Sequence, residues 1–134
     1  MYNKPMTLSI FWRIFPLWIK AFTLTLVIET PVFVALGRLL INRTGQPVST
    51  TRLAIAGALG TCLTHPLLWF VWPLVIRDYM SYVVTGEILV ALIETFTFFL
   101  IAKPISLRDA ALASFAANAV SVGLGYLLQA LGWM

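Results

Sequence analysis

The chain has 134 residues, of which 60% are hydrophobic and 10% are charged. Soluble domains are roughly half apolar and about a quarter charged, so these values exclude a soluble globular domain and a disordered chain. The single cysteine, Cys62, excludes a scaffold held by disulfide bonds within the chain. With a mean hydropathy of +0.94, the composition indicates an integral membrane protein. The net charge of +4 comes from Lys and Arg near the ends of apolar segments, which is typical of membrane topology and not of nucleic-acid binding.

The first apolar segment is too long for a single membrane span, which needs about 20 residues. Arg13, Pro16 and Lys20 interrupt its first part, and aromatic residues surround them. We therefore expect residues 8–20 to form a short amphipathic helix in the membrane interface. The alternative is a tilted extension of the first span. No small-residue cleavage site follows Lys4, so we expect the segment to be retained and not removed as a signal peptide.

The remainder of the chain divides into four apolar runs of helical length. Each run is continuous and not alternating, which favours membrane-spanning helices over the strands of a barrel. The links between them are short, so we expect a single membrane domain over residues 1–134. The expected spans are residues 21–41, 53–76, 86–102 and 110–131. The expected polar links are residues 42–51, 77–85 and 103–109.

The two halves of the chain repeat each other. The triplet Ile-Glu-Thr around Glu29 reappears around Glu94, and each Glu precedes a basic residue by nine positions. Thr61 and Asn118 likewise follow a charged residue by nine positions in the second and fourth spans. The sequence therefore predicts an all-α fold of four transmembrane helices built from two hairpin repeats. Both repeats enter the membrane from the same side, which makes them parallel-related about an axis along the membrane normal. Their bounds are residues 21–76 and 86–131.

The matched offsets place four polar residues at one depth. Nine helical residues rise ~13 to 14 Å, which is close to half of the roughly 30 Å hydrocarbon core. Glu29, Glu94, Thr61 and Asn118 should therefore all lie near the membrane midplane. Ionisable groups at this depth are costly and normally face the bundle interior with a partner. Two carboxyls there repel each other, so we expect at least one of them to carry a proton.

Two further titratable residues lie close to this layer. His65, the single histidine, lies one turn beyond Thr61. It fits a packing residue hydrogen-bonded to a carboxyl, a member of a proton or cation relay, or a metal or haem ligand. Glu87 shares a helix face with Glu94 and is either solvated at the span edge or the mouth of an acidic path. The candidate transport or polar-core site comprises Glu29, Glu94, His65, Asn118, Thr61 and Glu87.

Small residues recur at four-residue spacing in the second and fourth spans. They are Ala56, Gly60 and Thr64 in one span, and Ala113, Ala117, Ser121 and Gly125 in the other. Such stripes let helix backbones approach closely. We therefore expect these two spans to pack against each other at the centre of the bundle, with Gly60 and Ala117 at the crossing. The first and third spans would then turn their Glu-bearing faces inward.

Two classes of function fit this sequence. Midplane carboxyls with a histidine favour a transporter or channel for protons, cations or a small polar solute. Small size favours a non-catalytic accessory or structural subunit of a larger membrane complex. The sequence contains no phosphate-binding loop, no metal-ligand cluster and no Gly-x-Ser-x-Gly motif. We therefore expect no enzymatic activity, no catalytic residue, no metal and no cofactor, although the residue types alone fit an intramembrane hydrolase.

The expected partners are the lipid bilayer and either further copies of this chain or a larger membrane complex. The outline is similar to that of small bacterial four-span proteins built from duplicated hairpins. This resemblance implies a bacterial inner membrane and carries no functional residue with it. Basic residues on the two sides are nearly balanced, so the positive-inside rule gives only a slight preference for both termini outside the cytoplasm.

Overall fold

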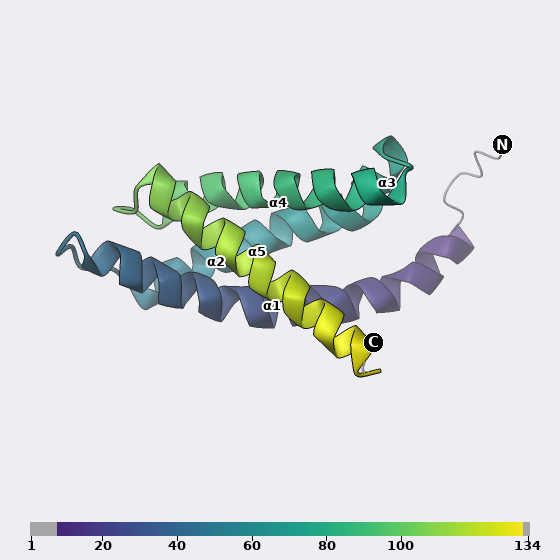
Figure 1. Ribbon diagram of the computed structural model, residues 1–134, viewed down its shortest axis with the longest axis horizontal. Helices are drawn as coiled ribbons and strands as arrows, with labels where there is room; N and C mark the ends of the chain where they lie inside the picture. The colour runs from purple at the N-terminus through teal and green to yellow at the C-terminus, as the bar shows by residue number, and fades with distance from the viewer. Residues whose placement is uncertain (1–7, 133–134) are drawn as a thin grey trace.

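The chain folds into helices, and no strand occurs in the part that the structure describes. This computed structural model describes residues 8–132, with side chains from residue 11 onward. Four helical segments of the described chain are long and apolar enough to cross a membrane, which confirms the predicted all-α fold with four such helices. The elements are α1 (Leu8–Asn42), α2 (Thr50–Pro66), η1 (Leu67–Val71), α3 (Trp72–Val75), α4 (Tyr79–Ile101) and α5 (Leu107–Ala130) (Figure 1). The elements α2, η1 and α3 together make the second span.

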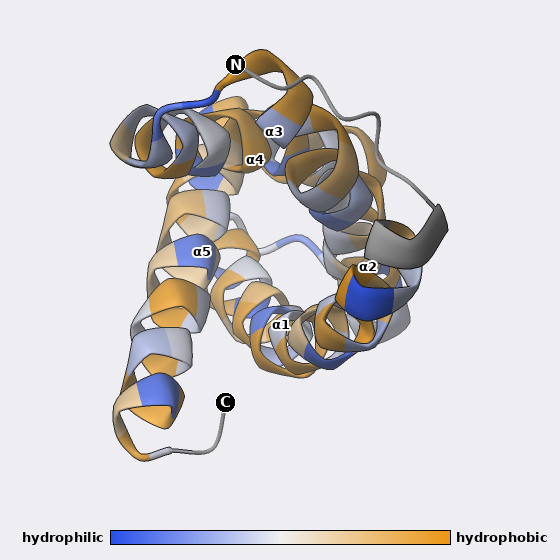
Figure 2. Ribbon diagram, turned by 90° about the vertical axis from the view of Figure 1, so that its right-hand side faces the viewer, coloured by the Kyte–Doolittle hydropathy of each residue, from blue (hydrophilic) through white to orange (hydrophobic). Residues whose placement is uncertain are grey.

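The four spans form a ring in which each packs against two neighbours. The packed pairs are α1 with α2, α2 with α4, α4 with α5, and α5 with α1. Figure 2, which looks along the bundle, shows α2 and α5 on opposite sides. The predicted central crossing of the second and fourth spans is therefore wrong.

The small residues of α2 make room for side chains of α1 and α4 and not for the backbone of α5. A Cβ on Gly57 would lie 2.9 Å from the Phe33 side chain of α1. A Cβ on Gly60 would lie 3.1 Å from Cγ of Glu94 on α4. The small residues thus allow a bulky or polar side chain to enter the bundle. A stripe of small residues in the sequence does not show whether it faces such a side chain or the backbone of a crossing helix.

Serine side chains fix the starts of α2 and α5 at matched positions. Ser49 accepts a hydrogen bond from the Arg52 N–H, and Ser106 accepts one from the Asp109 N–H. Serine is a favoured residue at this position because it satisfies a backbone donor at the helix start. Ser49 lies twelve residues before Thr61, and Ser106 lies twelve residues before Asn118, so each cap has the same offset from the predicted polar layer.

The helix α4 begins earlier than the sequence pattern indicated. Asp78 caps it by accepting a hydrogen bond from the Ser81 N–H at 2.8 Å, so that the helix starts at Tyr79. The expected link at residues 77–85 is therefore helical from residue 79, and the third apolar helix begins before the predicted residue 86. Polar and aromatic residues suggested a link, but they also suit the first turns of a membrane helix near the headgroups.

The helix α1 is continuous through residues 20 and 21, where the sequence suggested a boundary. It extends over 35 residues with two prolines inside it. Its aromatic N-terminal part packs on η1, with ring centroids 5.8 Å apart for Phe11 and Phe70 and 5.3 Å apart for Trp18 and Phe70. This continuity agrees with the alternative that residues 8–20 extend the first span. Their position in the membrane interface stays a prediction. Lys4 lies outside the described residues.

The second span changes to a π-helical turn at η1, directly after Pro66. Pro66 has no amide hydrogen to donate, which weakens regular helical bonding there. The Tyr82 hydroxyl of α4 donates to the Leu68 carbonyl at 3.1 Å and satisfies one acceptor of this turn. Gly86 provides the space, because a Cβ there would lie 2.6 Å from Cδ1 of Leu68. Turns of this kind are frequent at functional sites.

The apolar core lies at the end of the bundle that carries residues 42–49 and 102–106, which we term the closed end. Phe33, Leu53 and Phe98 have no exposed surface there, and alanines of α5 pack around them. At the opposite end, which we term the open end, α5 diverges from its neighbours. A Cβ on Gly123 or Gly125 would have no neighbouring atom within 4 Å. Packing thus seals one end of the bundle and leaves room at the other.

Candidate functional site

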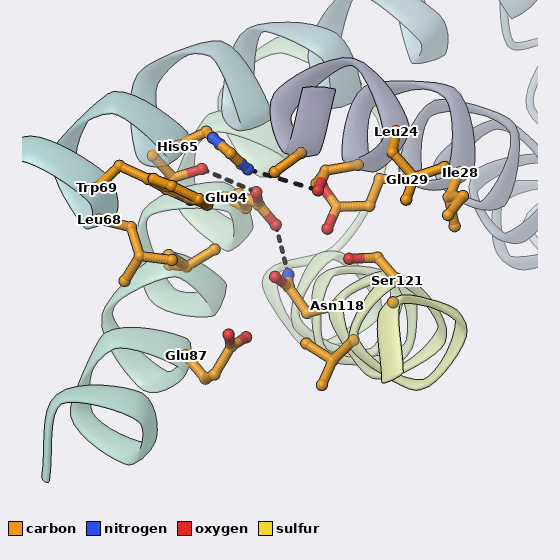
Figure 3. A pocket seen from close by; sticks show the side chains of 16 residues that line it. Leu24, Ile28, Glu29, His65, Leu68, Trp69, Glu87, Glu94, Asn118 and Ser121 are labelled. Atoms are coloured by element: carbon orange, nitrogen blue, oxygen red, sulfur yellow. Dashed lines mark hydrogen bonds between the residues drawn. The ribbon is translucent and has the colours of Figure 1, made fainter. Parts of the chain in front are cut away.

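All four spans line a cavity of about 210 Å³, which lies between the core of the closed end and the open end (Figure 3). We term it the inner cavity. Its polar side chains are Thr25, Glu29, Thr64, His65, Glu87, Glu94, Asn118 and Ser121. Five of the six predicted site residues are among these, and the sixth, Thr61, contacts one of them. The structure therefore brings the whole predicted set together, while its role stays a prediction.

Glu29 of α1 is 1% exposed and is held from both neighbouring helices. The Thr61 hydroxyl of α2 donates to its Oε2 atom at 2.8 Å. The Ser121 side chain of α5 points toward it and lines the same cavity (Figure 3). The predicted inward orientation of Glu29 is confirmed.

Glu94 of α4 is equally buried and has a matching set of partners. The Asn118 amide of α5 donates to Oε2 at 2.5 Å, and the Thr64 hydroxyl of α2 donates to Oε1 at 3.1 Å. The Ser114 hydroxyl lies 3.5 Å from Oε2. Glu94 therefore has hydrogen-bond partners on both neighbouring helices, and like Glu29 it points into the centre of the bundle.

His65 lies in the wall of the inner cavity and is 7% exposed. Its Nε2 atom is 3.5 Å from the Thr25 hydroxyl, and its Nδ1 atom has no hydrogen-bond partner in the described chain. The ring stacks on Trp69 at a centroid distance of 5.9 Å and meets the edge of Phe22 at 5.4 Å. His65 thus packs within an aromatic wall, and its hydrogen-bond contact is a hydroxyl and not a carboxyl, while its role stays a prediction.

Glu87 lies eight residues into α4 and not at its start, because α4 begins at Tyr79. It is half-buried and lines both the inner cavity and a second cavity of about 470 Å³, which we term the outer cavity. The outer cavity extends toward the open end, past Lys20, Tyr82 and Gln129. Glu87 thus lies between the open end and the buried glutamates, and an acidic path through it stays a prediction.

The sequence analysis did not single out Phe33 and Phe98. Their rings pack against each other at a centroid distance of 4.8 Å, on the closed-end side of the inner cavity. A signal for them exists, because each follows its glutamate by four positions in a shared pattern Ile-Glu-Thr-x-x-Phe. The pair belongs to the apolar core on the closed-end side of the two glutamates, and we term it the apolar floor.

In the described part of the chain, no three His, Cys, Asp or Glu side chains are grouped so that they could hold a metal ion. No protein-family model, no curated protein and no solved structure matches this chain at a significant level.

Proposed function

We propose that this protein transports protons or cations across a membrane, with Glu29 and Glu94 as the binding groups. The observation that carries the proposal is the inner cavity, in which two buried carboxyls are reached from the open end and separated from the closed end by an apolar core. Intramembrane ionisable groups are costly to bury and usually mark ion or substrate pathways. A site accessible from one side at a time is what a transporter requires.

The hydroxyl partners of the glutamates support proton exchange at this site. Each hydroxyl has one hydrogen to donate and can also accept. The Thr61 hydroxyl lies 3.3 Å from the Gly57 carbonyl as well as 2.8 Å from Glu29. The Thr64 hydroxyl lies 3.0 Å from the Gly60 carbonyl as well as 3.1 Å from Glu94. By turning toward its carbonyl, each hydroxyl becomes an acceptor for a protonated carboxyl, so both charge states keep a hydrogen bond without movement of the helices.

We also propose that the chain is a duplicated hairpin with a pseudo-twofold axis through this site. The partners support it: Thr61 and Asn118 are equivalent under the sequence repeat, as are Thr64 and Ser121. Each equivalent pair contacts the equivalent glutamates. In the ring of helices α1 lies opposite α4 and α2 lies opposite α5, so a twofold axis through the centre would exchange the two hairpins. An interfacial position for residues 8–20 and a bacterial inner membrane belong to this proposal as well.

A second candidate is a non-catalytic subunit of a larger membrane complex, or a homo-oligomer, in which the polar layer only joins the four helices. The two carboxyls are hydrogen-bonded to side chains of α2 and α5, which is also what a structural polar layer needs. The cavity around the carboxyls favours transport, because a layer that only joins helices gains nothing from open space beside it.

The proposal is tested in liposomes that contain the purified chain and a pH-sensitive dye. A potassium diffusion potential set with valinomycin drives proton uptake, which is measured by dye fluorescence. We expect uptake by the parent protein and loss of uptake in Glu29→Gln and Glu94→Gln, because glutamine keeps the shape but cannot bind and release a proton. Asp78→Asn is the matched control, since it removes an exposed carboxylate while asparagine still caps α4.

Uptake by both Gln variants at the rate of the parent would contradict the proposal. Absence of uptake in the parent, together with co-purification of a larger complex, would instead favour the subunit role. All variants are first compared with the parent by thermal melting in detergent, so that loss of fold is not mistaken for loss of transport.

A further inference from the structure

We infer that the inner cavity binds a small organic ammonium ion, an inference that rests on the proposed function and names the class of its substrate. The charge of the ligand follows from the lining. Three carboxyls, those of Glu29, Glu87 and Glu94, line the inner cavity, and its lining includes no Lys or Arg. Figure 3 shows these carboxyls directed toward a common space. A cation is therefore favoured there and an anion is repelled.

The walls favour an organic cation over a bare metal ion. Leu24, Ile28, Leu68 and Val90 line the same cavity and offer only apolar contact. A metal ion would have to replace its water shell with six or more oxygen ligands. The carboxyl oxygens already accept hydrogen bonds from side chains of α2 and α5, and no acidic or histidine cluster of metal-binding geometry exists among the described residues. An alkylammonium ion needs few hydrogen bonds and gains from burial of its carbon atoms.

The aromatic wall provides a further contact for such a ligand. Trp69 lines the inner cavity beside His65, on which it stacks. An ammonium group near the face of an indole ring is attracted by its electron-rich surface. The carboxyls of α1 and α4 would thus lie on one side of the ligand, and the Trp69 ring of η1 would lie on the other.

The size of the cavity limits the ligand to a small amine. A volume of about 210 Å³ corresponds to about seven water molecules at ~30 Å³ each. An ammonium ion with four or five carbon atoms therefore fits the inner cavity, and a larger substituent would extend into the outer cavity. The outer cavity, of about 470 Å³, is lined in part by Tyr82 and Tyr126.

Binding of the ammonium ion displaces a proton from the carboxyl pair. The charge balance is an exchange: the alkylammonium ion enters, one carboxyl loses its proton to water, and the net charge of the site is unchanged. The titratable groups that face the carboxyls are Glu87 on α4 and His65 on α2, while Lys20, Tyr82 and Tyr126 line the outer cavity. This exchange links uptake of the amine to release of a proton.

The probe is n-butylammonium chloride, titrated into the purified chain in detergent and followed by calorimetry. The titration is repeated in two buffers of different ionisation enthalpy, which reveals proton release. We expect saturable binding with release of a proton, and an affinity at least about tenfold lower in Glu94→Gln and Glu29→Gln, as for the loss of one charged contact. Asp78→Asn should bind like the parent. Neither 1-butanol nor sodium chloride should produce the signal.

Equal binding of 1-butanol would show that the carboxyls do not recognise charge, and equal binding of sodium would show an inorganic cation site; either result overturns the inference. Unchanged affinity in both Gln variants does so too. If liposomes take up protons through Glu94 but n-butylammonium does not bind, this inference fails and the proposed function stands. If the parent shows neither activity, both fail.

Discussion

The rings of Phe33 and Phe98 lie 4.8 Å apart at their centroids, one helical turn beyond Glu29 and Glu94 along their respective helices. Both rings are fully buried, and they join α1 to α4 across the bundle. Because each phenylalanine follows its glutamate by the same four positions, the contact also places the two carboxyls at similar depth. The closed end therefore begins immediately beside the polar layer.

Removal of one ring should open this barrier. Phe98→Ala is expected to raise the passive proton leak of liposomes, because it replaces a buried ring in the apolar floor with a cavity. It should also lower the free energy of unfolding by about 3–5 kcal/mol, the usual cost of such a truncation. The control is Phe96→Ala, two residues away on the same helix, since Phe96 is 55% exposed. A folded Phe98→Ala protein with the leak of the parent would show that the floor is not the barrier.

The glutamates should tolerate amides but not aliphatic side chains. Glu94→Gln is expected to melt within a few degrees of the parent in detergent, because glutamine still accepts from Asn118. Glu94→Leu should destabilise the fold by roughly 1–3 kcal/mol, since the buried Asn118 amide loses its carboxyl acceptor and keeps only the Ser114 carbonyl. Equal melting temperatures for the two variants would mean that the polar layer contributes nothing to stability.

A methyl group should be harmful in α2 and harmless in α5. Gly57→Ala is expected to lower stability by about 1–3 kcal/mol, because the added Cβ would lie 2.9 Å from the buried Phe33 ring. Gly123→Ala should leave stability unchanged or raise it, since the added Cβ has no neighbour within 4 Å and alanine favours the helix. Thermal melts of the two variants test this prediction. If Gly57→Ala melts at a higher temperature than Gly123→Ala, α1 and α2 lie further apart than in the structure.

Acid should loosen the start of α4. Hydrogen bonding to Ser81 holds the pKa of Asp78 below its ordinary value of 3.8. A depressed pKa means that the cap contributes stability above the ordinary value and loses it as the pH falls through the lower, folded value. NMR of the Ser81 amide should therefore show fraying only at pH values below about 3.8. In Asp78→Asn this acid-dependent change should be absent, whereas an identical pH profile would exclude the carboxyl as its origin.

Much of the polar site could be predicted from the sequence because depth in a membrane helix follows directly from residue count. The offsets of Glu29, Glu94 and Asn118 were sufficient to place them in one layer. The helix order around the ring could not be predicted, because Gly60 fits equally well against a backbone or against the side chain of Glu94. The start of α4 was missed for a related reason: one capping residue, Asp78, decides whether a polar and aromatic stretch is a link or a helix.

The π-helical turn at Leu67–Val71 sets the rotational phase of everything that follows it in the second span. One residue corresponds to ~100° of rotation in a regular helix, so a turn that contains one residue more than usual changes which side chain faces α4. In this phase the Trp72 indole donates to the Thr85 hydroxyl at 3.2 Å and lies against Gly86. A chain with one residue deleted between 67 and 71 would keep its composition and hydropathy almost unchanged, yet would turn Trp72 away from α4. The contact of the second span with α4 near the open end therefore depends on the length of this segment more than on its chemical nature.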